Sequence, residues 1–177
     1  MCAFFDHFLT GADNVHPDRL RQHAAMLMAT FLLLRFDEVS QIRREDIVRT
    51  TDLFGNTGFN VDLKDLTKTS REGGRHFLEG VPWVAGDPRA DPVLAVSLYL
   101  LVRGEEDGYL FCRFAPTSSG AIEIRADVHL NDKDFLEGLW SSLDVAGVEA
   151  YHFLETHSFK RGGVHLSSSL AFRTSRS

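Results

Sequence analysis

Arg35 stands inside an otherwise apolar stretch, Leu32-Leu33-Leu34-Arg35-Phe36, and Glu38 follows it three residues later. An arginine within a hydrophobic run is rarely buried without a partner, and on a helical path a residue at i+3 is close enough to contact it. The pattern predicts an apolar helix that carries Arg35 toward the core, where Glu38 orients its guanidinium. A guanidinium held in this way can bind two phosphate oxygens at once. An ordinary ion pair at the rim of the core is the alternative.

Two later segments carry residues that can bind or protonate a phosphate. Lys68 lies in Thr67-Lys68-Thr69, which is too polar for a strand interior and is expected at the exposed tip of a hairpin. Near the end of the chain, residues 157–163 read His-Ser-Phe-Lys-Arg-Gly-Gly. A solvated lysine in a turn is the alternative for Lys68, because exposed hairpin tips favour lysine.

These segments, in this order, resemble the motifs of the tyrosine recombinases, the phage-integrase family. Residues 32–47 are similar to the first-arginine box, and Thr67-Lys68-Thr69 to the β-hairpin lysine. Residues 157–163 resemble the His-x-x-Arg box, most closely the form found in eukaryotic transposon-borne recombinases of the Crypton and DIRS type. The segment Tyr109-Leu110-Phe111-Cys112-Arg113 is similar to a stretch between helices in a member of the family and is expected to be structural.

The resemblance implies that DNA is the substrate and that neither a metal nor a nucleotide cofactor is needed. Arg35, His157 and the residue at the Lys160 position would stabilise the charge that develops on phosphate. Glu38 would steady Arg35, and Lys68 would protonate the leaving 5′ oxygen. The implied catalytic residues are Arg35, Glu38, Lys68, His157, Lys160 and Arg161, and the expected DNA-binding arginines are Arg43, Arg44 and Arg71.

Two features depart from the family pattern. Lys160 stands where the family has its second arginine, and an ammonium cannot form the planar two-point contact of a guanidinium. The family's nucleophile is a tyrosine that follows the histidine box, but the three tyrosines here are Tyr99, Tyr109 and Tyr151, all before His157. We therefore expect no strand cleavage by the chain as given. Whether it belongs to an enzyme depends on a reading frame that continues past Ser177 into a tyrosine.

Two functions follow as alternatives. The first is a DNA-binding, integrase-like domain from a recombination or integration system, inactive in cleavage and bound to double-stranded DNA. The second is a non-catalytic remnant that acts as a protein-interaction or structural module. Possible protein partners are a second copy of the chain or an intact recombinase. Binding through phosphate contacts would weaken steeply with salt, whereas a protein–protein surface would not.

Composition sets further limits. The chain has 177 residues, a length that suits one domain, and a net charge of −6. The charge is segregated: residues 43–75 carry seven basic and six acidic side chains, and residues 157–177 carry four basic and none acidic. These segments can form a local positive face if they meet. No apolar run is long enough to span a bilayer, so we expect an intracellular protein, nuclear if the host is a eukaryote, with no membrane partner. Two cysteines make neither a disulfide framework nor a metal site.

The pattern of apolar residues, caps and turns predicts an α+β fold, mostly helical with one small three-stranded antiparallel sheet. The resemblance implies the tyrosine-recombinase catalytic fold, with residues 1–177 forming a single, C-terminally incomplete domain. Helices are expected over residues 1–10, from Pro17 through Phe31, from Pro92 through Leu101 and from Asn131 to about Gly147. The expected strands are 47–54, 59–66 and 76–84. Residues 114–130 are expected to form a loop.

Overall fold

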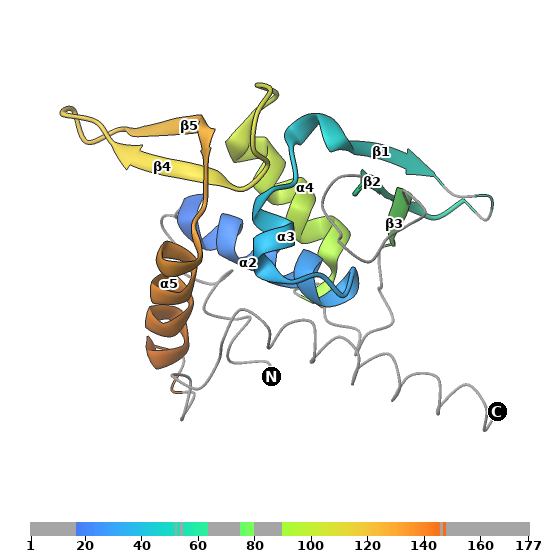
Figure 1. The fold of residues 1–177 in the computed structure, drawn as a ribbon, viewed down its shortest axis with the longest axis horizontal. Helices are drawn as coiled ribbons and strands as arrows, with labels where there is room; N and C mark the ends of the chain where they lie inside the picture. The colour runs from blue at the N-terminus through green and yellow to red at the C-terminus, as the bar shows by residue number, and fades with distance from the viewer. Residues whose placement is uncertain are drawn as a thin grey trace.

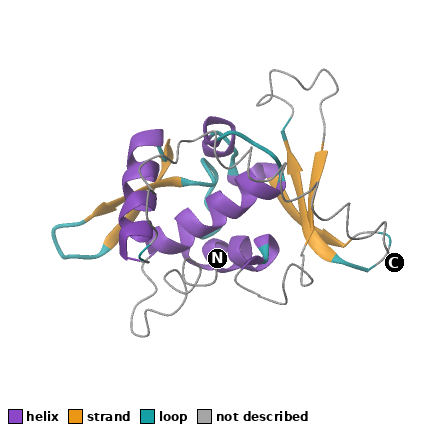
Figure 2. Cartoon of the chain, turned by 90° about the horizontal axis from the view of Figure 1, so that it is seen from below, coloured by secondary structure: helices purple, strands orange, loops and turns teal. Residues whose placement is uncertain are grey.

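A computed structural model of the chain describes residues 17–51, 53, 55–63, 75–79, 90–145 and 147. This part of the molecule is α+β, with α2, α3 and α4 between two small antiparallel sheets and α5 beside the sheet of β4 and β5 (Figures 1 and 2). The helices are α2 (Pro17–Phe31), α3 (Phe36–Ser40), α4 (Pro92–Arg103) and α5 (Asp132–Val145), with a 3-10 turn η1 (Arg44–Asp46). The strands are β1 (Ile47–Thr51), β2 (Thr57–Asp62), β3 (Arg75–Glu79), β4 (Cys112–Pro116) and β5 (Ile122–His129). The expected helix over residues 1–10 lies outside the described residues.

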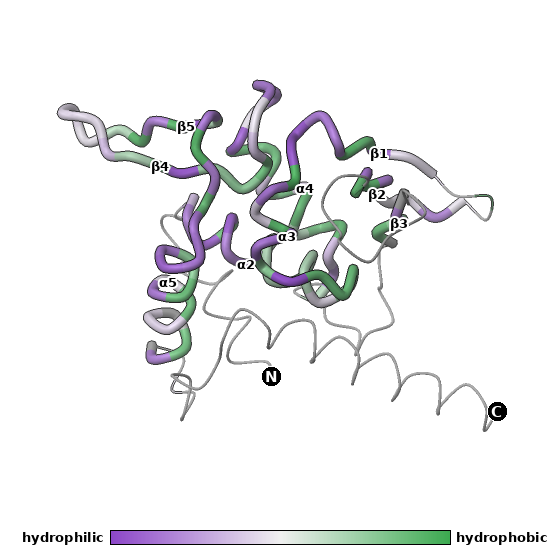
Figure 3. Tube along the Cα trace, in the orientation of Figure 1, coloured by the Kyte–Doolittle hydropathy of each residue, from purple (hydrophilic) through white to green (hydrophobic). Residues whose placement is uncertain are grey.

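Helix α2 is the centre of the fold, as its apolar circumference predicts. It begins at Pro17, whose fixed φ suits the first helical position, and every residue from 20 to 29 is buried. Helices α3, α4 and α5 all pack against it. Figure 3 shows the hydrophobic residues gathered toward these helices, and the loop after α4 is hydrophilic.

The end of α2 differs from the expectation for Arg35. The helix stops at Phe31, and Leu33 adopts the left-handed conformation with φ of 55°. The N–H of Leu34 then donates to the Ala29 carbonyl at 2.9 Å, which closes the helix in the manner of a Schellman motif. The chain reverses here, so Arg35 is not part of the long apolar helix.

Helices α4 and α5 begin where their capping residues predict. The carboxylate of Asp91 accepts the N–H groups of Val93 at 2.8 Å and Leu94 at 3.1 Å, and Pro92 takes the first helical position. The side-chain oxygen of Asn131 accepts the N–H of Asp134 at 2.8 Å. Each cap satisfies N–H groups that the first helical turn leaves without an internal partner.

Strands β1, β2 and β3 form the predicted antiparallel meander, in that order. Phe59 of β2 pairs with Arg49 of β1 and with Leu78 of β3, so the register is continuous across the sheet. Phe59 and Leu78 are both buried, which sets one face of the sheet against the helices. The segment 64–74, which contains the expected hairpin tip with Lys68 and Arg71, lies outside the described residues.

A second antiparallel sheet occupies the segment that was expected to be a loop. Strands β4 and β5 pair with Phe114 opposite Ile124 and Pro116 opposite Ile122. Apolar residues alternate with charged ones from Ile122 to Val128, which is the period of a strand with two different faces. The loop prediction for residues 114–130 is therefore wrong: the serine and glycine residues near position 119 form only the turn that joins the two strands.

Candidate functional site

Arg35 lies at the surface, at the first turn of α3. Its backbone N–H donates to the Glu38 carboxylate at 2.8 Å. Its guanidinium is exposed and forms no hydrogen bond or ion pair with the described residues. The prediction that Glu38 holds the Arg35 side chain near the core is therefore wrong. Glu38 instead holds the backbone N–H of Arg35, and the charged side chain of Arg35 stays exposed to solvent.

The next two arginines on this side of the molecule are both engaged in ion pairs. Arg43 donates through Nε to Glu45 at 2.6 Å, and its guanidinium lies 5.4 Å from the centre of the Tyr109 ring. Arg44 pairs with Glu105 and also donates to the Ile47 carbonyl at 3.3 Å. The charges of both guanidiniums are thus partly neutralised by carboxylates of the same chain.

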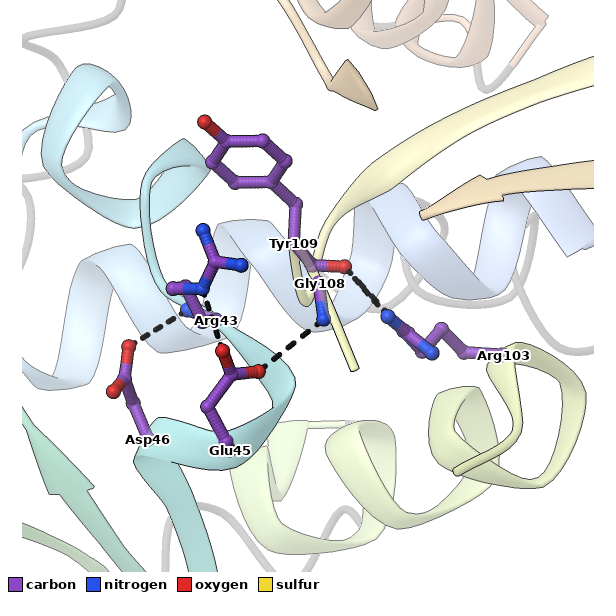
Figure 4. A network of polar contacts seen from close by, with 6 residues as sticks. All are labelled: Arg43, Glu45, Asp46, Arg103, Gly108 and Tyr109. Carbon is purple, nitrogen blue, oxygen red and sulfur yellow. Dashed lines mark hydrogen bonds and ion pairs between the residues drawn. The ribbon is translucent and has the colours of Figure 1, made fainter. Parts of the chain in front are cut away.

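Glu45 connects the turn after α3 to the segment that precedes β4 (Figure 4). One of its carboxylate oxygens accepts from Arg43, and the other accepts the N–H of Gly108 at 3.2 Å. The hydrogen bond from Arg43 is the largest cause that lowers the pKa of Glu45, and the same contact raises the pKa of Arg43. Both groups therefore stay charged across the neutral range, and the link between the two segments persists with them.

The segment 109–113 is held through its backbone carbonyl and N–H groups by α4, by Ile42 and by β5. Arg103 at the end of α4 donates to the Tyr109 carbonyl at 3.1 Å, as Figure 4 shows. Tyr99, also in α4, donates through its hydroxyl to the Leu110 carbonyl at 2.8 Å. The backbone N–H groups of the segment bond to other parts of the chain: that of Leu110 donates to the Ile42 carbonyl, and that of Tyr109 donates to the Ala126 carbonyl. This network agrees with the structural role that the sequence predicts for the segment.

Two buried arginines belong to this structural network and were not predicted. Arg103 is 1% exposed, and Arg21 of α2 is 6% exposed. Arg21 donates to the Cys112 carbonyl at 2.7 Å, pairs with Asp18 at 2.6 Å and lies over the ring of Phe114. A charged residue among apolar helical positions was the available signal. That signal predicts burial for Arg35, whereas among the described residues the buried arginines are Arg21 on α2 and Arg103 on α4.

The remaining predicted site residues fall outside the described part of the chain. Lys68 and Arg71 lie in segment 64–74, and His157, Lys160 and Arg161 lie in segment 148–177. Their roles as catalytic or DNA-binding residues stay predictions. Among the described residues, no three histidine, cysteine or carboxylate side chains come together as a metal site.

Comparisons with known proteins add no family. No family model matches the chain, and no characterised protein matches it either. No helix in the described ranges combines the length and the apolar character needed to cross a bilayer. A functional proposal for this chain therefore rests on the order of its motifs and on the geometry around Arg35.

Proposed function

We propose that this chain is a DNA-binding domain of the tyrosine-recombinase type, with the fold of that family's catalytic domain, which has lost strand cleavage. The observation that carries the proposal is the state of Arg35. Its guanidinium is exposed and unpaired among the described residues, and Glu38 fixes the backbone beneath it. An exposed guanidinium with no carboxylate partner among the described residues, on a backbone that is held in place, is suited to bind one phosphate of a DNA backbone.

The order of elements supports the same proposal. Arg35 is followed by the turn of η1 and then by the meander, whose β2–β3 connection contains Lys68. This is the order in which the resemblance places the first arginine and the hairpin lysine. A domain of this kind in a eukaryotic cell would act in the nucleus, where its DNA is.

The ion pairs of Arg43 and Arg44 refine the expected DNA contacts. Each of these guanidiniums would have to leave, or share, a carboxylate before it could bind phosphate. Arg35 has no such competitor among the described residues. We therefore expect Arg35 to contribute more to DNA binding than Arg43 or Arg44 does.

The test is binding of the purified chain to a labelled DNA duplex across a salt series. Arg35→Ala and Lys68→Ala are each expected to weaken binding by about tenfold at low salt and to lower the slope of log affinity against log salt by about one, the signature of one lost phosphate contact. Arg35→Lys retains the charge and should lose less affinity.

Arg125→Ala is the matched control. It removes an exposed arginine of β5 that already pairs with Asp127 at 3.5 Å, and so makes the same change in net charge elsewhere on the molecule. Equal losses for Arg35→Ala and Arg125→Ala would show that only overall charge matters. Absence of binding even at low salt would refute the proposal.

A further inference from the structure

Helix α4 is apolar around most of its circumference, with Ser97 and Arg103 as its polar residues, yet only one side of it faces the core. The residues that it buries are Pro92, Ala95, Val96, Tyr99 and Arg103. The opposite side presents Leu94 and Leu101, which lie seven residues apart, the spacing of a helix–helix packing seam, whereas Leu98 is partly buried against the core. Leu101 is 82% exposed. Apolar helix faces are normally covered by another part of a protein, so we expect a further surface to pack on this outer face.

A groove runs beside this face, between α4 and β1. Its volume is about 580 Å³. Strand β1 lies at one edge of the described three-stranded sheet, and its Ile47 and Arg49 share the sheet face of Phe59. Ile47, Phe59, Leu100 and Leu101 form its apolar lining, and Arg44, Arg49 and Glu105 add charged groups. The groove and the exposed Leu101 form one continuous apolar surface, which we name the α4–β1 face.

The two sides of the groove carry opposite charges. Glu105, just past the end of α4, is 85% exposed at its side chain, so most of the carboxylate remains accessible although it pairs with Arg44. Arg49 of β1 is exposed and forms no ion pair with the described residues. One side therefore offers a carboxylate, and the other offers an unpaired guanidinium.

We propose that the α4–β1 face binds a second copy of this chain through a two-fold axis that runs along the groove. Such an axis places the α4 side of one copy over the β1 side of the other. Leu101 of each copy then enters the groove of its partner, and each Glu105 comes opposite the other copy's Arg49. A surface that carries both a protruding leucine and an apolar groove, with complementary charges on its two sides, is self-complementary, as a two-fold interface requires.

Sedimentation velocity of the full chain over a range of concentrations tests this proposal. The wild-type chain is expected to pass from monomer to dimer as concentration rises. Leu101→Asp places a charge in the interface twice per dimer and should weaken association by about 100-fold or more. Leu53→Asp is the matched control, because Leu53 is fully exposed and lies outside the groove. It should leave association unchanged.

A charge swap makes the test specific to this arrangement. Arg49→Glu alone and Glu105→Arg alone should each weaken the dimer, and the double variant should recover most of the lost affinity. A wild-type chain that stays monomeric, or a dimer that Leu101→Asp weakens no more than Leu53→Asp does, would overturn the proposal. A change in DNA binding would not bear on it, since Leu101 and Arg49 are not among the proposed DNA contacts and Glu105 affects them only as the ion-pair partner of Arg44.

Discussion

The backbone N–H of Arg35 donates to the carboxylate of Glu38, which lies one turn further along α3, at 2.8 Å. The acidic residue thus acts as the returning half of a capping box and satisfies an N–H group at the start of the helix. The Glu38 carboxylate forms no ion pair with the Arg35 guanidinium. The sequence predicts a buried ion pair for these two residues, but Arg35 is instead exposed, with no ion pair to any residue in the described ranges.

Glu38→Ala should lower the free energy of unfolding by about 1 kcal/mol, because one hydrogen bond at the helix start is lost. Glu38→Gln retains a side-chain oxygen that can accept the same N–H, and it should retain most of the stability. Urea denaturation of both variants measures the difference. If Glu38→Gln is as unstable as Glu38→Ala, the carboxylate acts through its charge and not through this hydrogen bond.

Leu33 is a place where the native residue does not suit its backbone. Its φ of 55° costs a residue with a Cβ roughly 1–2 kcal/mol, which glycine does not lose. Leu33→Ala and Leu33→Gly both remove the leucine side chain, so comparing them isolates the backbone effect. Leu33→Gly should be about 1 kcal/mol more stable than Leu33→Ala in thermal or urea unfolding. Equal stability would mean that the turn after α2 relaxes to a negative φ.

This position also explains why the sequence misplaced Arg35. The apolar run continues through Leu32-Leu33-Leu34, and the glycine that commonly ends a helix is absent, so nothing local marks the stop at Phe31. By contrast, α2 begins at Pro17, and α4 and α5 begin directly after their capping residues Asp91 and Asn131, so the residue type alone predicts these helix starts. Elements with a local signal were predictable, and the end of α2 had none.

The buried arginines could not be predicted for a different reason. Arg21 is held by the Cys112 carbonyl, 91 residues away in the chain, and Arg103 by the Tyr109 carbonyl. The sequence indicates that a charge lies among apolar residues, but it does not show which distant backbone group will accept its hydrogen bonds. The β4–β5 hairpin was predictable from the alternation that begins at Ile122, since this signal is local.

Gly108 is required by the close approach of the segment before β4 to β5. It has φ of 125°, and a Cβ at this position would overlap the carbonyl oxygen of Ala126. Gly108→Ala should therefore cost about 3 kcal/mol or more, from backbone strain and from displacement of the chain. Gly120→Ala is the matched control: its φ is 80°, but nothing lies within 4 Å of the added methyl, and the cost should be about 1 kcal/mol. Similar losses for the two variants in urea denaturation would contradict the contact with Ala126.

Cys112 should make stability decrease at alkaline pH. Burial raises the pKa of its thiol, although the nearby guanidiniums of Arg103 and Arg21 act in the opposite direction. In the unfolded chain a cysteine ionises near pH 8.5, so above that pH the folded state holds a proton that the unfolded state has lost. The contribution of the Cys112 thiol to the free energy of unfolding is therefore complete below about pH 8.5, and it is lost as the pH rises through the pKa of this thiol in the folded state.

Cys112→Ala tests this dependence through its slope, since the lost side chain also lowers stability by an amount that does not vary with pH. Burial raises the pKa of Tyr99 well above its ordinary value too, so the comparison belongs between about pH 8.5 and pH 10, before a free tyrosine ionises. Urea denaturation at several pH values in this window should show a falling stability for the wild-type chain and a flatter curve for Cys112→Ala. Parallel curves would show that the thiol is not protonated preferentially in the folded state, and that the alkaline loss has another origin.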